Sequence, residues 1–283
     1  MIVNKRFTII PFASSLQEDI MQFLTLGPAR GMDVLRQVSI NSSTTKQGVY
    51  KILRHLLGQE IIVKENGFFI LNKLWLSRIK EFATNSEDAI GLRLPFSSPS
   101  SNRKKVIIFK DAEALDIYWG HLYLTLTQAF KDSPIFFFNH HSWSIYERAH
   151  SEKYLYESSL KKSQKVLITL GSNTQMAQKF KKQFSKNNIQ ITIDEHFSMP
   201  KTDHICVIGD YCILTRYDNK AMAQINSLFN NSGSLNEPEI KELHKILMDC
   251  KKPKIIISKN SRLANIWKRR LAKNFIIKKS ELL

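Results

Sequence analysis

Apolar residues in the first part of the chain recur every three or four positions, a spacing that predicts amphipathic helices. The first helix begins near Ser14 or Ser15, because either serine is a suitable N-cap, and the Gly27–Pro28 pair ends it. A second, shorter helix is predicted over Arg30–Val38. We expect the serines of the polar stretch that follows, residues 41–44, to cap the next helix.

The third predicted helix, Thr44–Leu57, has two chemically different faces. Its apolar positions are expected to pack inward, and they are Val49, Ile52, Leu53, Leu56 and Leu57. Its polar positions are expected to stay at the surface, and they are Thr45, Lys46, Gln47, Tyr50, Lys51 and Arg54. Two strand-like runs, Glu60–Lys64 and Phe68–Leu71, flank the sequence ENG and predict a β-hairpin. Another helix is predicted over Leu74–Phe82.

Beyond residue 105, short apolar runs alternate with longer amphipathic segments, which predicts an α/β fold with a largely parallel or mixed sheet. Strands are predicted over Val106–Phe109, Ile135–Phe138, Lys165–Thr169, Ile189–Ile193, His204–Ile208, Tyr211–Thr215 and Lys254–Ser258. Helices are predicted over Glu113–Ala129, Trp143–Ser158, Thr174–Ser185, Lys220–Phe229, Pro238–Asp249 and Arg262–Phe275.

The segment 83–105 is rich in Ser, Asn and Pro, and we expect it to be a linker between two domains, residues 1–82 and 106–283. Residues 251–283, at the end of the second domain, carry eleven Lys and Arg against one Glu. This basic tail either adds contacts to phosphates or forms a solvated helix face. The side chains expected on its exposed face are Lys268, Arg269 and Lys273.

Lysine and arginine total 42 against 25 Asp and Glu, a formal net charge of +17. Such an excess implies a polyanionic partner, with nucleic acid favoured over an anionic membrane surface. The chain has neither a run of roughly 18 apolar residues nor a long apolar signal core at its start, so we expect a cytoplasmic protein. Cys206 and Cys212 would form a redox pair only if neighbouring strands brought them together, and cysteines in strands more often fill cores.

The order helix, helix, turn, helix and hairpin over residues 18–72 resembles the winged helix-turn-helix of prokaryotic transcription regulators. The phrase TTKQGVYKILRHLLGQEIIVKENGFFIL is similar to the recognition helix and wing of that family. The resemblance implies double-stranded DNA as the partner, with the start of the third helix at base edges and the wing at phosphates. The residues expected at the DNA are Ser43, Thr44, Thr45, Lys46, Gln47, Tyr50, Lys51, Arg54 and Lys64. Winged helices also bind proteins, so a protein–protein adaptor is an alternative.

The phrase TDHICVIGDYCILTRYDN resembles the second-half motif of phospholipase-D-like domains, in which a His attacks phosphorus and a Lys two residues later binds the phosphate. His204 matches the His, but Cys206 stands at the Lys position and Asp210 falls one residue short of the Asp position. TrmB-like regulators pair a winged helix with such a degenerate domain. This resemblance implies a sensor or dimerisation domain without enzymatic activity, and a phosphodiesterase or nuclease that uses His204 is the alternative.

The polar cluster NHHSW, residues 139–143, follows the predicted strand Ile135–Phe138. Because α/β domains place ligands at the carboxyl ends of strands, one interpretation is a pocket for a small-molecule effector. The other is a plain strand-to-helix turn capped by Ser142. The residues expected at a pocket are His140, His141, Trp143, Arg148 and His204. Adjacent histidines point in different directions, and no phosphate-binding glycine loop occurs, so we predict neither a metal site nor a cofactor.

Together these patterns predict a DNA-binding transcription regulator that recognises a palindromic site as a homodimer, because two copies double the contact area. Its second domain is expected to sense a ligand or to hold the dimer together.

Overall fold

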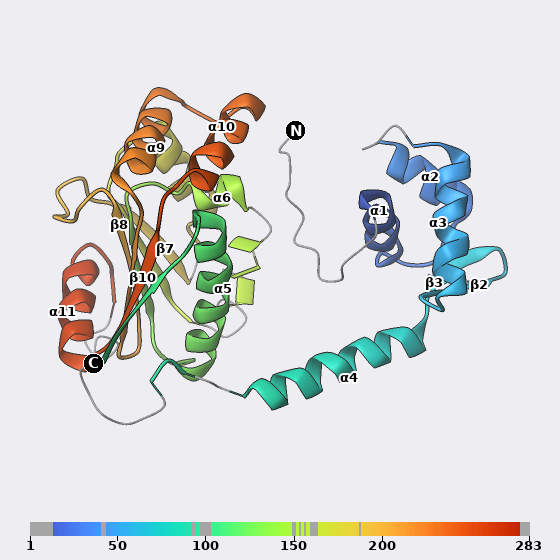
Figure 1. The fold of residues 1–283 in the computed structure, drawn as a ribbon, viewed down its shortest axis with the longest axis horizontal. Helices are drawn as coiled ribbons and strands as arrows, with labels where there is room; N and C mark the ends of the chain where they lie inside the picture. Colours follow the sequence, from blue (N-terminus) through green and yellow to red (C-terminus); the bar gives the residue numbers. More distant parts are fainter. Residues whose placement is uncertain are drawn as a thin grey trace. The chain divides into compact units, whose positions relative to one another are not determined.

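The structure is a computed structural model that describes residues 14–40, 44–91, 94–96, 103–148, 151–152, 154–155, 157–158, 164–186 and 188–277. The chain divides into two compact units, of which one spans Phe7–Gly91 and the other contains Leu92–Leu283 (Figure 1). Each unit encloses its own hydrophobic core. The helices and mixed sheets together make an α/β protein, as the alternation of patterns predicts.

The described part of the first unit contains helices and a small antiparallel sheet with the strand order β1-β3-β2. The helices are α1 (Ser15–Leu24), α2 (Gly31–Ser39), α3 (Lys46–Gly58) and α4 (Lys73–Ile90). The strands are β1 (Ala29–Arg30), β2 (Ile62–Glu65) and β3 (Phe68–Leu71). The sequence pattern predicted each of these elements except the two-residue strand β1, which is too short to carry a period-two signal.

Local side-chain chemistry sets the ends of these elements. The Ser14 hydroxyl accepts a hydrogen bond from the backbone N–H of Gln17 and caps α1, as predicted. Thr45, instead of a serine of the preceding turn, caps α3. Asn66 and Gly67 connect β2 to β3 with φ angles of 49° and 84°, which is the geometry of a type I′ turn and matches the twist of a two-residue hairpin.

Helix α4 continues through the first part of the segment that the sequence assigned to the linker. It begins at Lys73, after the Asn72 cap, and ends at Ile90 instead of Phe82. Serine, threonine and asparagine have low helix propensity, but the penalty is only a few tenths of a kcal/mol for each residue, so one turn of them does not end a helix. The next described strand begins at Arg103, three residues before the predicted start.

A seven-stranded mixed sheet forms the centre of the second unit, with the strand order β4-β10-β9-β8-β5-β6-β7. Strands β5, β6 and β7 are parallel to one another, and the other neighbouring pairs are antiparallel. The strands are β4 (Arg103–Ile108), β5 (Ile135–Asn139), β6 (Val166–Leu170), β7 (Ile189–Ile193), β8 (Asp203–Ile208), β9 (Tyr211–Arg216) and β10 (Lys254–Lys259).

Helices cover both faces of this sheet (Figure 1). Along β5, Ile135 and Phe137 face one core, and Phe136 and Phe138 face the other. Helix α11 packs on the second face, opposite α5. The helices are α5 (Ala112–Ala129), α6 (Ser144–Glu147), α8 (Gln175–Phe184), α9 (Asn219–Asn231), α10 (Glu237–Met248) and α11 (Ser261–Ala272).

Two predictions for the second unit need correction, and one is confirmed. The helix predicted over Trp143–Ser158 is interrupted: α6 ends at Glu147, Arg148 leaves the helical conformation with φ −137°, and the described residues between 151 and 158 are helical again. Cys206 and Cys212 fill cores, as expected of strand cysteines, and they face opposite sides of the sheet, so their thiols cannot form a disulfide. Lys268 is only 5% exposed, because the face of α11 that bears it packs against the sheet.

We predict that Gly209→Ala lowers the free energy of unfolding of the second unit by about 2–4 kcal/mol. Gly209 has φ +54° in the turn between β8 and β9, and a Cβ there would collide with the ring of Phe130. Guanidinium denaturation followed by circular dichroism measures the loss. The control is Gly120→Ala in the interior of α5, where a Cβ meets no atom within 4 Å, and which should stabilise the unit by about 0.5–1 kcal/mol. Equal stabilities of the two variants would contradict the prediction.

Candidate functional site

Helix α3 presents a polar and basic stripe on the side opposite to its buried face. Val49, Leu53 and Leu56 are fully buried in the core of the first unit. On the other side, exposed side chains follow one another at the spacing i, i+4, i+7, which aligns them along one helix face. They are Gln47, Lys51 and Arg54, with exposed Lys46 beside them at the start of the helix.

Other residues predicted at the DNA have more varied surroundings. Thr44 is half-buried, and the hydroxyl of exposed Thr45 accepts a hydrogen bond from the N–H of Gly48. The prediction for Tyr50 needs correction, since its ring is half-buried against the core and contacts the start of α2, where it fills the space beside Gly31. Exposed Lys64 lies on β2, with its ammonium group 5.6 Å from the centre of the Phe69 ring. Ser43 lies outside the described residues.

Positive charge in the first unit is concentrated on α3. Residues 14–91 contain nine Lys and Arg against eight Asp and Glu, so this part of the chain is almost neutral. Helix α3 nevertheless has three basic residues and no acidic residue, whereas α1 and α4 both carry carboxylates. The stripe is therefore the most cationic surface that a helix of this unit offers to a polyanion.

The second unit contains a cavity of about 60 Å³ on the sheet face that α5 covers. The cavity lies between the carboxyl end of β5, strands β8 and β9, and the middle of α5. Aromatic rings form much of its wall, and they are Trp119, Tyr123, Phe137, Trp143 and Tyr217.

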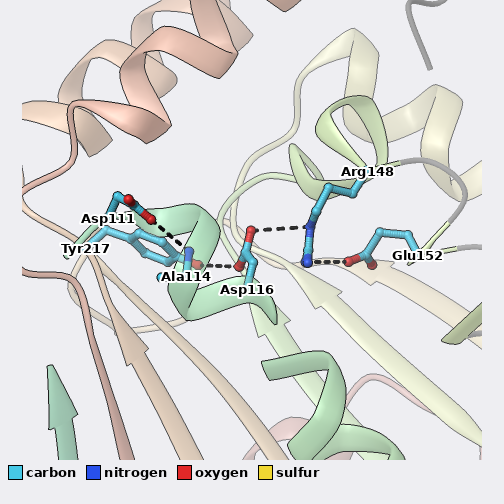
Figure 2. A network of polar contacts seen from close by, with 6 residues as sticks. All are labelled: Asp111, Ala114, Asp116, Arg148, Glu152 and Tyr217. Carbon is cyan, nitrogen blue, oxygen red and sulfur yellow. Dashed lines mark hydrogen bonds and ion pairs between the residues drawn. The ribbon is translucent and has the colours of Figure 1, made fainter. Parts of the chain in front are cut away.

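Several of the residues that line the cavity are joined by polar contacts, with Arg148 between two carboxylates (Figure 2). The Nε atom of Arg148 lies 3.5 Å from Asp116 Oδ2, and its Nη2 atom lies 3.5 Å from Glu152 Oε1. The hydroxyl of Tyr217 donates to the other oxygen of Asp116 at 3.4 Å. Burial, together with the negative charge of Asp116, holds the pKa of Tyr217 well above its usual value, so this phenol remains a donor.

The structure brings four of the five predicted pocket residues together at this cavity: His141, Trp143, Arg148 and His204. His140 is the exception and needs correction, because its ring points away from the cavity and its Nε2–H donates to the carbonyl of Pro200 at 3.1 Å. The alternation of neighbouring side chains after a strand separates the two histidines.

His141 lines the cavity, but both of its ring nitrogens already have partners. Nε2 lies 2.8 Å from Asn226 Oδ1, and Nδ1 lies 2.8 Å from Ser172 Oγ. Burial is the main cause that lowers the pKa of His141 to about 4. The ring is therefore neutral at pH 7, and these hydrogen bonds hold its orientation instead of leaving it free for a ligand.

Among the described residues that line the cavity, three buried polar atoms make no hydrogen bond: the Nε1 of Trp143, the Nε2 of His204 and the Nε of Arg148. The Arg148 atom forms the ion pair with Asp116, which leaves the two rings. These side chains are 3% and 7% exposed, and their ring centres lie 6.2 Å apart. Burial, followed by the proximity of His140 and His141, lowers the pKa of His204 to about 3. A neutral imidazole and an indole N–H are therefore the open polar groups of this site.

The two carboxylates of the cavity and Tyr217 were not predicted from the sequence. Asp116 lies in the second turn of α5 directly before an apolar and aromatic run, and an acid at such a position is a signal that could have been used. Glu152 carries no comparable signal, since it belongs to a polar stretch.

Within the described ranges, no group of three or more His, Cys, Asp or Glu side chains is placed to hold a metal ion. Of the helices that the structure describes, none is both long and apolar enough to cross a membrane.

No protein-family model matches this sequence, and no curated protein matches it. One of the similar solved structures matches over 90% of this chain and 89% of its own, with 10% sequence identity and a TM-score of 0.37. It is TrmBL2, an archaeal chromatin protein whose structure shows a novel mode of DNA binding.

We predict that acidification from pH 7 to pH 5 lowers the free energy of unfolding of the second unit. His204→Gln should make this decrease smaller by about 2 kcal/mol. His204 has a pKa of about 3 in the folded protein and about 6.5 when unfolded, so below pH 6.5 protons bind preferentially to the unfolded chain. The stabilisation that the neutral His204 ring gives to the folded state is complete above pH 6.5, and it is lost as the pH falls towards 3. Urea unfolding at both pH values measures the difference. Exposed His196→Gln is the control and should keep the wild-type pH dependence, and the same dependence in His204→Gln would contradict the prediction.

Proposed function

We propose that this protein is a transcription regulator that binds duplex DNA through α3 and the β2–β3 hairpin, used as a winged helix-turn-helix. In this proposal α3 enters the major groove, Gln47 and Arg54 contact base edges, and Lys51 contacts phosphates. Lys64 on the hairpin reaches the neighbouring phosphate backbone. Two copies of the chain bind the two halves of a palindromic site.

The observation that carries this proposal is the exposed stripe of α3, made of Gln47, Lys51 and Arg54. These side chains lie within three turns on one face and include both amide and guanidinium groups. Amide groups pair with adenine and guanidinium groups with guanine in the major groove, so the stripe has the chemistry needed to distinguish bases. A generic phosphate-binding surface would need only the charge.

We further propose that the second unit acts without catalysis, as a ligand-binding domain. A phosphodiesterase that used His204 would need this ring to reach a phosphorus atom, with cations beside it to bind the phosphate. His204 is 93% buried, and burial lowers its pKa to about 3. Cys206 stands where the phosphate-binding Lys would be, and the nearby Arg148 already contacts two carboxylates. These features favour the sensor over the nuclease.

We predict that the Gln47→Ala/Arg54→Ala double variant loses the preference of the full-length protein for its operator. The operator would first be selected from a random duplex library, and then titrated beside a scrambled duplex by fluorescence anisotropy at two salt concentrations. Wild-type protein should bind the selected duplex at least ~10³-fold more tightly than the scrambled one. The variant should lose at least ~10-fold in affinity for the selected duplex and little for the scrambled one, because base contacts carry the specificity.

The matched control is Lys220→Ala/Gln224→Ala on α9, which also removes one positive charge and one amide from exposed positions four residues apart. It should bind like the wild type. Equal and steeply salt-dependent binding of wild-type protein to both duplexes would overturn the specific regulator in favour of a general nucleic-acid binder. An absence of binding at moderate salt would favour the protein–protein adaptor. Cleavage of the duplex that His204→Ala abolishes would favour the nuclease.

A further inference from the structure

The cavity of the second unit leaves a buried hydrogen-bond donor without an acceptor. No described residue accepts a hydrogen bond from the Nε1–H group of Trp143, although this side chain is only 3% exposed. Nearly all buried polar groups in proteins are paired, because an unpaired one loses its hydrogen bonds to water without replacement. An indole N–H can only donate. The missing partner must therefore be an acceptor atom.

The second open group of the cavity is the Nε2 atom of His204, which makes no hydrogen bond within the described part of the chain. Burial keeps this ring neutral at pH 7, because it lowers the pKa of His204 to about 3. Only one nitrogen of a neutral imidazole carries a proton, so the other is an acceptor. The rings of Trp143 and His204 line the same cavity with their centres 6.2 Å apart, so one small molecule can contact both.

The ionised side chains of the cavity already contact one another. The guanidinium of Arg148 lies 3.5 Å from both Asp116 and Glu152, and the hydroxyl of Tyr217 donates to Asp116. A charged ligand would lose its hydration on entering the cavity, and it would have to displace one of these contacts to gain an ion pair. The two open rings offer hydrogen bonds without a charge, which favours an uncharged ligand.

The size and the wall of the cavity restrict the ligand further. A volume of about 60 Å³ is enough for a molecule of only a few non-hydrogen atoms. Aromatic rings, among them Trp119, Tyr123 and Phe137, form much of the wall and suit a flat molecule with some apolar surface. A primary carboxamide group is planar and carries an acceptor oxygen and an NH₂ donor on one carbon atom. It therefore combines the two functions that the open rings need.

We propose that this cavity binds a small uncharged molecule with a primary carboxamide group. The amide oxygen accepts a hydrogen bond from Nε1–H of Trp143, and the amide NH₂ group donates to Nε2 of His204. The inference rests on the proposed ligand-binding role of the second unit and specifies the class of its ligand. It is tested without DNA, so that its failure and a failure of DNA binding can be distinguished.

The ligand class is tested with probes of the same planar shape and size: acetamide, acetone, acetate and acetamidinium. Each is titrated at pH 7 into the full-length protein labelled with ¹⁵N, and NMR follows the Nε1–H signal of Trp143. Phe variants of Trp75, Trp119 and Trp267 assign this signal by elimination, since the chain has four tryptophans. Acetamide should move the signal downfield and saturate at millimolar concentration, because a new hydrogen bond deshields the proton and a ligand of this size binds weakly.

The four probes should differ in affinity. Acetamide should bind at least ~5-fold more tightly than acetone, which keeps the acceptor oxygen and lacks the donor. Acetate and acetamidinium should bind at least ~10-fold more weakly than acetamide, because both carry a charge into the cavity and acetamidinium also lacks an acceptor. Equal or tighter binding of any other probe would overturn the carboxamide class. A Trp143 signal that acetamide does not move at millimolar concentration would overturn the ligand site in favour of a cavity that holds only water.

Two variants test the two hydrogen bonds separately. His204→Phe removes Nε2 and keeps a ring, so it should lower the affinity for acetamide to about that for acetone and leave acetone unchanged. Trp143→Phe removes the donor that both probes use, so it should weaken both by a similar factor of at least ~5. The other signals that acetamide shifts in the wild type report this affinity. An unchanged affinity for acetamide in either variant would overturn the assignment.

The controls are His196→Phe, at an exposed position, and Trp267→Phe, on the opposite face of the sheet. Both should bind acetamide like the wild type. Thermal unfolding of each variant shows whether it is folded at the temperature of the titration. If either pocket variant is unfolded there, the four probes on the wild-type protein still decide the ligand class.

Discussion

Both faces of strand β5 are buried, and much of the second unit follows from this constraint. Phe136 and Phe138 on one face and Ile135 and Phe137 on the other are at most 9% exposed. A strand with two apolar faces needs a helical layer on each side, and α5 and α11 contribute to these layers. The polar residues that follow β5 therefore begin inside the protein. Their hydrogen bonds must be found there, with Pro200, Ser172 and Asn226 as partners.

The cavity beside β5 is costly for stability, which bears on why its groups are present. Two carboxylates and one guanidinium are removed from water there, with ion-pair distances of 3.5 Å that recover only part of the lost solvation. A protein with apolar side chains of similar volume in place of these charged groups would often be as stable or more stable. The unpaired N–H of Trp143 adds to the cost. Because such costs concentrate at functional sites, the cavity is a candidate for ligand binding.

The sequence pattern predicted the elements with strong periodicity, and its predictions failed where tertiary contacts determine the local structure. The apolar face of α3 and the Asn66-Gly67 turn were both evident, because each follows from local spacing or turn chemistry. Strand β1 and the early end of α6 depend on partners far along the chain, such as β3 for the strand and Asp116 for Arg148. A pocket was one of the two interpretations of the polar cluster after β5, beside a plain strand-to-helix turn. Asp116 and Tyr217 were missed because they come from distant elements that meet only in the fold.

The formal charge of +17 is a poor guide to where a polyanion would bind, because the basic side chains that make it up are not equally accessible to phosphate. On α11, Lys268 is buried, and Arg270 stacks on Trp267 while it donates to the carbonyl of Ser198. These cations help to hold α11 in place and are less available to phosphate than their number suggests. The almost neutral first unit exposes Lys51 and Arg54 on a face without acids. Sequence recognition depends on such placement of a few groups, whereas total charge sets mainly the affinity for any duplex and its dependence on salt.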